Sequence, residues 1–505
     1  MNHNDNHQAA TIKFNAPLCG LQISEESTKL YVTAYFDHIH PIYPFLDRQT
    51  FERKVFQGDL ALLLQDSPPF SALYYSVLAL GSQYHGSGSF EPGRGTSWKF
   101  FQAALGLFPE ILIPKETLVN VQAIFARNSS CVQIGDMLTA EAARMAQSLG
   151  LNRAICDSEN ISVSQRTFWV IYILEKTLSF ACGRSSILID SDIGTPVPEA
   201  PEANFGKFDW FYSVCRFSRL ISKAYDALFS ISATLLSTNS IKSTIDNSNH
   251  ELECWRKAIP EDFRPGSPLR HLCDLDKASI AITLRVHCHY YSVVIALTRL
   301  RLSLPEAASS CPATDDKEVL LNACRAIIEL TKYIDLATYT PIWILVSVPI
   351  SATFILFDFI IHDPTHDKTK SNLSLLGIAA GYFCSLEYVS GGALQTSLLS
   401  DIAHIARDYI HSVDRSDVVR RTDSIFEVGS SQHTDATRTE LQTPVSIDTG
   451  GQNLMGGMFT GHMNMDEPFY PADTLLSPLG NRLPEGIDLM DLFSTALPDG
   501  IYSFE

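Results

Sequence analysis

Two clusters of histidine and cysteine have residue types that could bind a metal or take part in catalysis. The first is the stretch YFDHIHPIYPFLDRQTF, Tyr35–Phe51, with His38 and His40. Side chains two positions apart on a helix point roughly 200° away from each other, so these two imidazoles could not share a metal ion. The second is His287-Cys288-His289 in a long apolar segment, where successive side chains diverge by about 100° and positions in a core or groove are expected. Neither cluster predicts a metal site.

No other pattern in the sequence predicts catalysis or cofactor binding. The eleven cysteines are scattered, without C-x-x-C or zinc-type Cys/His spacing. The glycine-rich segment His85–Gly95 follows no strand and supplies no Walker lysine, so a surface loop is expected there. Hydrolase, zinc-protease, P-loop and dinucleotide motifs are not found. We therefore expect no catalytic residue, no metal ligand and no cofactor, in a protein that is not an enzyme.

The histidine-rich stretch instead predicts a corner between two helices. A serine or threonine cap would begin a helix over residues 29–39, which Pro41 would end. Asp47 would then cap the next helix, with Leu46 and Phe51 at the spacing of a hydrophobic staple. The unusual residues of the stretch are thus expected to have structural roles.

Charge and composition bound the class of protein. The chain has 505 residues and a net charge of −18. Residues 414–505 carry 15 acidic and 5 basic side chains, a net charge of −10. Because nucleic-acid binding needs clustered Lys and Arg to neutralise phosphates, this chain alone is not expected to bind nucleic acid directly. The scattered cysteines and the polar N-terminus, without a signal-peptide pattern, indicate a reducing compartment.

Helical periodicity dominates residues 27–413, so the predicted fold is all-α, with one large multi-helix domain. Leu138, Ala142, Met145 and Leu149 follow one helix face, and a long apolar helix is expected over residues 278–304. Residues 1–26 are predicted to be a disordered arm, and residues 414–505 a disordered acidic tail. Loops are expected at residues 237–250, 305–317 and 362–372.

One apolar segment, Pro341–Ile361, is long enough to span a bilayer. Pro349 near its middle, Asp358 inside it and the lack of flanking basic residues favour a buried pair of core helices, broken near Pro349, over a membrane span. No membrane association is expected.

Three ordered motifs resemble the fungal-specific transcription factor domain, the regulatory middle region of zinc binuclear-cluster activators. They are YFDHIHPIYPFLDRQTFE, MLTAEAARMAQSLGLNRAI (Met137–Ile155) and the segment Ser164–Ala200, and the resemblance covers about Thr28–Ile410. The resemblance implies structural roles for the following motif residues: Phe36, His40, Pro41, Pro44, Phe45, Asp47, Phe51, Arg144, Met145, Gly150, Leu151, Phe168, Trp169, Gly183 and Arg184.

The sequence also departs from this family. Glu175 stands where an Asp is usual, and Ser185 where the proline of a G-R-P motif is expected. The family's six-cysteine zinc cluster should precede the domain, but only Cys19 precedes it here. We therefore expect recruitment to DNA by a partner, which would be a DNA-binding transcription factor or a homo- or heterodimer partner. The resemblance further implies a nuclear regulator of a pathway-specific gene set, such as a biosynthetic cluster, and a possible small-molecule effector.

The C-terminal residues suggest a second contact with partners. In segment 483–505 large apolar residues surround Asp488 and Asp491. Such segments stay solvated and fold when apolar anchors enter a partner's groove. We interpret it as an activation segment for a coactivator or repressor protein, with these anchors: Ile487, Leu489, Met490, Leu492 and Phe493.

Two other interpretations remain open at the level of the sequence. The chain could be a truncated gene model of a full zinc-cluster activator. Alternatively, the helical body could be a metabolite-binding protein or an enzyme encoded in the same locus, which a deep pocket lined by converging polar groups would favour.

Overall fold

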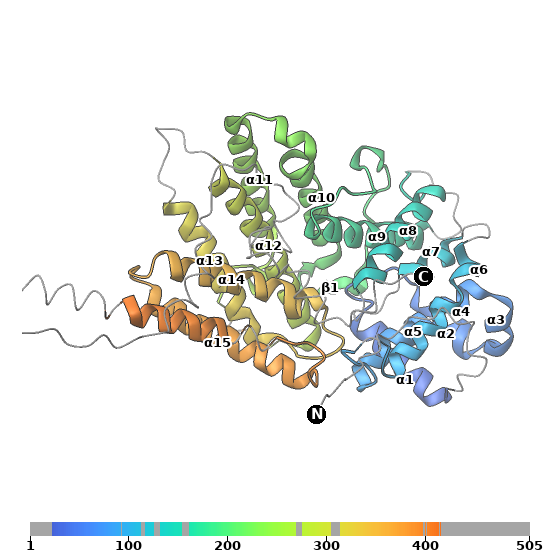
Figure 1. Ribbon diagram of the computed structural model, residues 1–505. Helices are drawn as coiled ribbons and strands as arrows, with labels where there is room; N and C mark the ends of the chain where they lie inside the picture. Colours follow the sequence, from blue (N-terminus) through green and yellow to red (C-terminus); the bar gives the residue numbers. More distant parts are fainter. Residues whose placement is uncertain are drawn as a thin grey trace, which may run out of the picture.

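The computed structural model describes residues 23–91, 93–112, 117–125, 132–153, 161–268, 275–304, 314–396, 399, 401–413 and 415. Within these ranges the protein is all-α, as predicted, apart from one β-hairpin whose two strands have two residues each. Helices α1 to α7 gather at one end of the molecule, α13 to α15 lie at the other, and α9 to α12 stand between them (Figure 1). Residues 1–22 of the predicted arm and the predicted activation segment, with its five apolar anchors, lie outside the described residues. Residues 23–26 were predicted to belong to the disordered arm, but they hold the cap and the first residues of α1.

The first part of the chain folds into helices of 3 to 21 residues. Their bounds are α1 Glu25–His38, α2 Arg48–Phe56, α3 Leu60–Asp66, α4 Pro68–Ser82, η1 Gln83–His85, α5 Thr96–Gly106, α6 Phe108–Leu112, α7 Leu118–Phe125, α8 Val132–Ser148 and α9 Ile161–Ala181.

Short turns and the hairpin then lead into the longer helices of the second part. The bounds are η2 Asp190–Asp192, η3 Pro201–Ala203, β1 Asn204–Phe205, β2 Phe208–Asp209, α10 Trp210–Ala224, η4 Tyr225–Phe229, η5 Ile231–Leu235, α11 Thr238–Ala258, η6 Glu261–Phe263, α12 Lys277–Ser303, α13 Thr314–Leu330, η8 Thr331–Tyr333, η9 Trp343–Ser347, α14 Val348–His362 and α15 Thr369–Val389. The two strands pair antiparallel.

The histidine-rich stretch forms the predicted corner between α1 and α2. Asp47 caps α2 by accepting a hydrogen bond from the backbone N–H of Thr50 at 2.8 Å. The His40 ring is buried, and its Nε2 lies 2.8 Å from the carbonyl oxygen of Leu46. This hydrogen bond connects the beginning of the corner to its end. The start of α1 was predicted wrongly: the helix begins at Glu25, where the side chain of Ser24 provides the cap.

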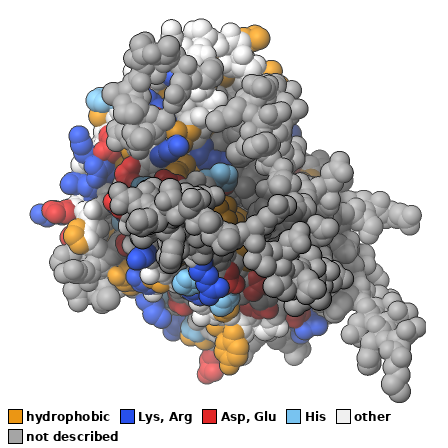
Figure 2. Space-filling model, turned by 60° about the vertical axis from the view of Figure 1, so that its left-hand side comes forward, with side chains coloured by type: hydrophobic (Ala, Val, Ile, Leu, Met, Phe, Trp, Pro, Cys, Tyr) orange, Lys and Arg blue, Asp and Glu red, His pale blue; other side chains and the backbone are white. Residues whose placement is uncertain are grey.

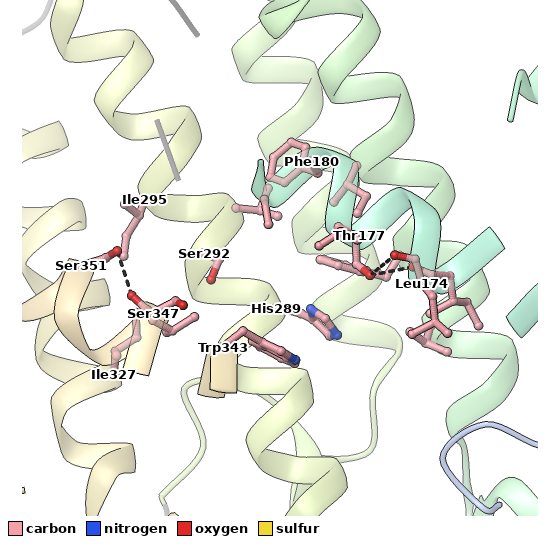
Figure 3. A pocket seen from close by; sticks show the side chains of 18 of the residues that line it. Leu174, Thr177, Phe180, His289, Ser292, Ile295, Ile327, Trp343, Ser347 and Ser351 are labelled. Atoms are coloured by element: carbon pink, nitrogen blue, oxygen red, sulfur yellow. Dashed lines mark hydrogen bonds between the residues drawn. The ribbon is translucent and has the colours of Figure 1, made fainter. Parts of the chain in front are cut away.

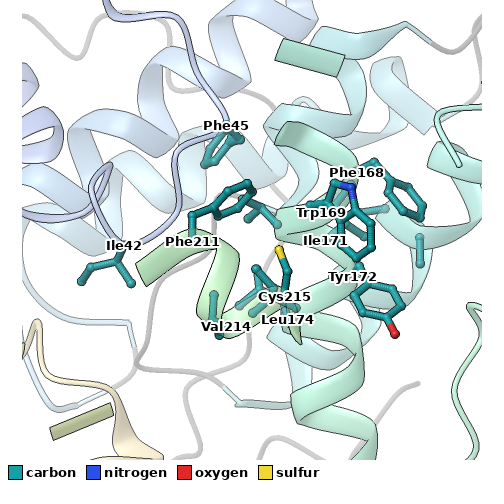
Figure 4. Packing of buried hydrophobic residues seen from close by; sticks show 14 of the residues in the cluster. Ile42, Phe45, Phe168, Trp169, Ile171, Tyr172, Leu174, Phe211, Val214 and Cys215 are labelled. Atoms are coloured by element: carbon teal, nitrogen blue, oxygen red, sulfur yellow. The ribbon is translucent and has the colours of Figure 1, made fainter. Parts of the chain in front are cut away.

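A first core cluster joins the corner to α9 and α10. Trp169 and Phe168 are fully buried in it, and Phe211 of α10 and Phe45 of the corner belong to the same cluster (Figure 4). The indole N–H of Trp169 donates to the carbonyl oxygen of Pro196 at 2.8 Å, which attaches the irregular segment 190–200 to α9.

A second core cluster forms among α12, α13, α14 and α15. Two helical stretches of the described residues, α12 and Trp343–His362, are long and apolar enough to cross a membrane by length and composition. More than half of each most apolar window is buried inside the protein, at 61% and 56%. Both stretches act here as core helices.

Two element predictions were wrong. Residues 237–250 were expected to be a loop but begin helix α11, which Ser237 caps. Its buried residues are only Ile245, Leu252 and Trp255, so the apolar signal is too sparse to reveal the period. Instead of a helix pair broken near Pro349, a π-helical turn, η9, runs directly into α14, and Pro349 lies just after the junction. Proline has no N–H to donate to the carbonyl four residues earlier, and that carbonyl, of Leu345, accepts a hydrogen bond from the Tyr382 hydroxyl instead.

Candidate ligand-binding cavity

Most residues of the three sequence motifs lie in the core. Their side chains expose 4% of their surface or less, as for Phe36, Phe45, Phe51, Met145, Leu151, Phe168 and Trp169. Arg144 differs, because it is exposed on α8 and pairs with Glu141 one turn away. These positions pack or cap helices, and they bring no reactive groups together.

Two glycines of the motifs end helices in the left-handed conformation. Gly150 has φ +68° and Gly183 has φ +61°. After each, a backbone N–H reaches back five residues, from Leu151 to Ala146 and from Arg184 to Ser179, both at 2.9 Å. Arg184 then pairs with Asp136 of α8 at 2.7 Å, which connects the end of α9 to a neighbouring helix.

A buried acid, Glu175, lies in the middle of α9. The Glu175 carboxylate is 3% exposed and accepts hydrogen bonds from the backbone N–H of Ile187 at 2.8 Å and from the Ser186 hydroxyl at 2.6 Å. The adjacent Lys176 donates to the carbonyl oxygen of Leu188 and lies 3.3 Å from Asp190. The segment after α9 is therefore held through polar side chains of the helix itself.

A cavity of about 170 Å³ lies between the two core clusters. Protein interiors seldom contain voids larger than a water molecule, so a cavity of this size is a departure from normal packing. Its walls come from α9 and α10 on one side and from α13, η9 and α14 on the other, with α12 running between them (Figure 3). Tyr43 of the corner also reaches its wall.

The cavity is mostly apolar but holds a few polar groups. Its aromatic walls are Tyr43, Phe180, Trp210, Phe217 and Trp343. His289 and Ser292 of α12 are one turn apart on the helix, and both side chains lie at the cavity (Figure 3). Ser347 and Ser351 lie on the far wall, where the Ser351 hydroxyl donates to the Ser347 carbonyl at 3.0 Å.

The His289 imidazole is held between two aromatic rings. Its centroid lies 5.0 Å from that of Trp343, with 22° between the planes, and 4.9 Å from that of Phe217. Burial, together with the positive charge of Arg285, lowers the pKa of His289 to about 3. The ring is therefore neutral at physiological pH, with one nitrogen able to donate and the other able to accept. Within the described residues, no protein group hydrogen-bonds to this ring.

The second histidine of the pair has a different role. His287 is 2% exposed, and burial lowers its pKa to about 4 while backbone hydrogen bonds with Phe263 and Arg264 oppose the shift. Cys288 between them is buried in the second core cluster. The structure thus separates the two imidazoles, and only His289 faces the cavity.

The described residues contain no group of three or more His, Cys, Asp or Glu side chains that could hold a metal ion. On the face drawn in Figure 2, Lys and Arg side chains are mixed with Asp and Glu between the grey atoms. That part of the described surface presents no uniformly basic patch to a nucleic-acid backbone.

The sequence motifs contain some of the residues that line the cavity, but they did not predict the cavity itself. Tyr43 and several residues of α9 belong to the motif segments, whereas Ser292, Trp343 and Ser347 lie outside them. The His-Cys-His run was the one available signal, since we expected core or groove positions for it.

Residues 32–257 match the model of the fungal specific transcription factor domain. The "ABC-transporter-regulating transcription factor" of Aspergillus fumigatus is 26% identical over 392 residues, which cover 70% of this chain and 43% of that protein. The protein of the same name from Aspergillus oryzae is 27% identical, over 57% of this chain and 36% of its own length. The "Fusaridione A cluster transcription factor fsdR" of Fusarium heterosporum is 24% identical, over 80% of this chain and 83% of its own length.

The chain thus spans less than half the length of the two Aspergillus relatives. No solved structure matches it significantly. The family match ends within α11, so the cavity has one wall inside the matched region and one wall after it. The similarity to the fungal specific transcription factor domain thus covers residues 32–257 of this chain.

Proposed function

We propose that this protein is a regulator of transcription whose activity responds to a small molecule bound in the cavity. The observation that carries the proposal is the position of the cavity between the two core clusters. A ligand there contacts both clusters at once, so it favours the arrangement of helices in which both walls fit it. The similarity to transcription factors supports the regulatory output.

The relatives suggest what kind of genes respond. Two of them are named for regulating ABC transporters, and a third for the fusaridione A cluster. We propose a pathway-specific gene set of this kind, in which the ligand is a compound that the controlled pathway makes, exports or removes.

We propose that the protein acts in the nucleus and reaches DNA with a partner. A net charge of −18 disfavours contact with phosphates by this chain alone. The partner would be a zinc-cluster transcription factor or a dimer partner. Residues 27–413 would form the regulatory domain, and segment 483–505 would contact a coactivator or repressor.

Chromatin occupancy of the tagged full-length protein, with and without the final twenty-two residues, tests the regulatory role. We expect promoter-bound signal in both cases and lost transcription only after truncation. Absence of enrichment anywhere would contradict the proposal and favour a metabolite-binding protein.

A cavity-filling substitution tests the ligand dependence without knowledge of the natural ligand. Ser292→Leu places a larger side chain in the cavity, while Ser303→Leu adds the same side chain at an exposed site on the same helix. We expect a target-gene reporter to become locked at one level with Ser292→Leu and to respond normally with Ser303→Leu. Equal reporter responses from both variants would rule out the cavity as the effector site.

A further inference from the structure

We propose that the cavity takes an uncharged, flat aromatic compound of one or two fused rings that carries one hydrogen-bonding group. This inference names the ligand class and rests on the proposed function of the cavity.

The size of the cavity sets the size of the ligand. An apolar protein cavity of about 150 Å³ accommodates benzene, and the cavity here measures about 170 Å³. One ring or two fused rings fit this space, whereas a sterol or a long peptide does not.

The walls determine that the ligand is flat and aromatic. Four aromatic side chains line the cavity from three separate elements: Phe180, Trp210, Phe217 and Trp343. Aromatic rings gain energy from offset stacking and from edge-to-face contacts with one another, beyond the burial of apolar area. A flat ring system can make such contacts with several walls at once.

The polar groups determine that the ligand also forms a hydrogen bond. In the described part of the chain, no protein partner hydrogen-bonds to the His289 ring, the Ser292 hydroxyl or the indole N–H of Trp343, and all three residues line the cavity. All three residues are half-buried. A ligand that fills the cavity would enclose their polar groups, and an enclosed polar group is unfavourable unless it has a partner. A ligand with one N–H or O–H group on its ring could donate to the acceptor nitrogen of His289 or to the Ser292 oxygen, whereas the indole N–H of Trp343 needs an acceptor.

The charges at the cavity exclude a cation. None of the described residues that line it is acidic, and Arg299 contributes a positive charge. A buried cation without a counter-charge is strongly unfavourable. The pKa of His289 is about 3, so this ring stays neutral and adds no charge of its own.

The groups that select the ligand come mainly from outside the family match. His289, Ser292, Trp343, Ser347 and Ser351 all follow residue 257, whereas the matched region supplies mostly apolar wall. Relatives that keep the matched region can therefore differ in ligand.

Isothermal titration calorimetry of the purified full chain with two matched pairs of probes tests the inference. Indole and indene have nearly the same shape, but only indole has an N–H group. Benzyl alcohol and benzylammonium differ mainly in charge. We expect indole to bind about tenfold more tightly than indene, as one additional hydrogen bond implies. We expect benzyl alcohol to bind and benzylammonium to give no heat of binding.

Two variants assign the preference to the cavity. Ser292→Ala and His289→Phe should each reduce the advantage of indole over indene, while Ser303→Ala on the exposed side of α12 should leave it unchanged. Ser292→Ala removes only one oxygen atom, so this variant should fold even if His289→Phe does not. Equal affinities for indole and indene in the unaltered protein, or no binding of any probe, would overturn the inference. The proposed function is judged separately, by the reporter response to Ser292→Leu.

Discussion

The imidazole of His289 and the indole of Trp343 lie face to face, with centroids 5.0 Å apart and 22° between their planes. His289 belongs to α12 and Trp343 to η9, and the ring of Phe217 of α10 has its centroid 4.9 Å from that of the imidazole. One neutral ring therefore connects residues of both core clusters next to the cavity. Any ligand that touches His289 is coupled to the contact between the two clusters.

The stability of the protein should fall as the pH drops below about 6.5. The folded pKa values of His289 and His287 are about 3 and about 4, below the ordinary value of 6.5. Between these values the unfolded chain binds protons that the folded chain does not, so stability is fully present above the unfolded pKa and declines in acid. Each histidine should contribute a loss of about 2 kcal/mol between pH 6.5 and about pH 5. Urea unfolding at several pH values measures this.

His289→Phe isolates one of these two contributions. Phenylalanine keeps a ring next to Phe217 and Trp343 but cannot bind a proton. The loss of unfolding free energy in acid should therefore be smaller by the contribution of one histidine. His250→Gln, at an exposed position of α11, serves as the control and should retain the full decline. An unchanged decline in His289→Phe would show that the ring is protonated in the folded protein.

Replacing the buried acid of α9 should be costly. Glu175→Gln puts an amide N–H₂ group among donors, from Ile187 and Ser186, that need an acceptor. Loss of such a partner in a buried site costs about 1–3 kcal/mol, and more for charged groups. Glu141→Gln, on the exposed side of α8, should cost less than about 1 kcal/mol. Thermal unfolding of both variants gives the comparison, and equal costs would contradict the assigned role of Glu175.

The indole N–H of Trp169 should control the attachment of segment 190–200. Trp169→Phe leaves the carbonyl of Pro196 without its donor and is expected to destabilise the protein by about 1–3 kcal/mol, apart from the effect of the smaller ring. Limited proteolysis should then cut within residues 190–200 faster than in the parent protein. Tyr388→Phe, at a site that is 86% exposed, should leave the cutting rate unchanged. A cutting rate unaffected by Trp169→Phe would show that other contacts hold the segment.

Two glycine-to-alanine substitutions should have opposite effects. Gly150 has φ +68°, a left-handed conformation that costs a residue with a side chain roughly 1–2 kcal/mol, so Gly150→Ala should destabilise. Gly381 lies inside α15 with nothing within 4 Å of an added Cβ, so Gly381→Ala should stabilise by about 0.5–1 kcal/mol. Chemical denaturation measures both, and a stabilising effect of Gly150→Ala would refute the left-handed turn.

The predictable part of this fold rests on local signals that do not depend on distant contacts. Asp47 at a cap, Gly150 at a helix end and the uninterrupted apolar segment of α12 each determine structure within a few residues. Helix α11 lacks such a local signal and was therefore missed. Only three of its side chains are buried, too few to show the helical period in the sequence.

The cavity could not be predicted from the sequence. It is a space that the side chains of helices far apart in the sequence leave unfilled where those helices pack. Ser292 looks like any polar residue in a long helix, and Trp343 like any core aromatic. Their proximity follows from the packing of α12 against η9, which no local pattern specifies. The sequence around His289 indicates that its side chain lies either in the core or in a groove. Which of the two applies depends on the residues that pack around it in space.

The π-helical turn at Trp343–Ser347 contains one residue more than an α-helical turn, and Tyr382 donates to the carbonyl of Leu345 within it at 2.7 Å. Deletion of one residue there would turn the preceding part of the chain by about 100° about the helix axis and carry Trp343 away from His289. The place of Trp343 in the cavity wall therefore depends on a single codon. Gene copies that differ by that one codon would keep the same scaffold while gaining or losing the capacity to sense a compound.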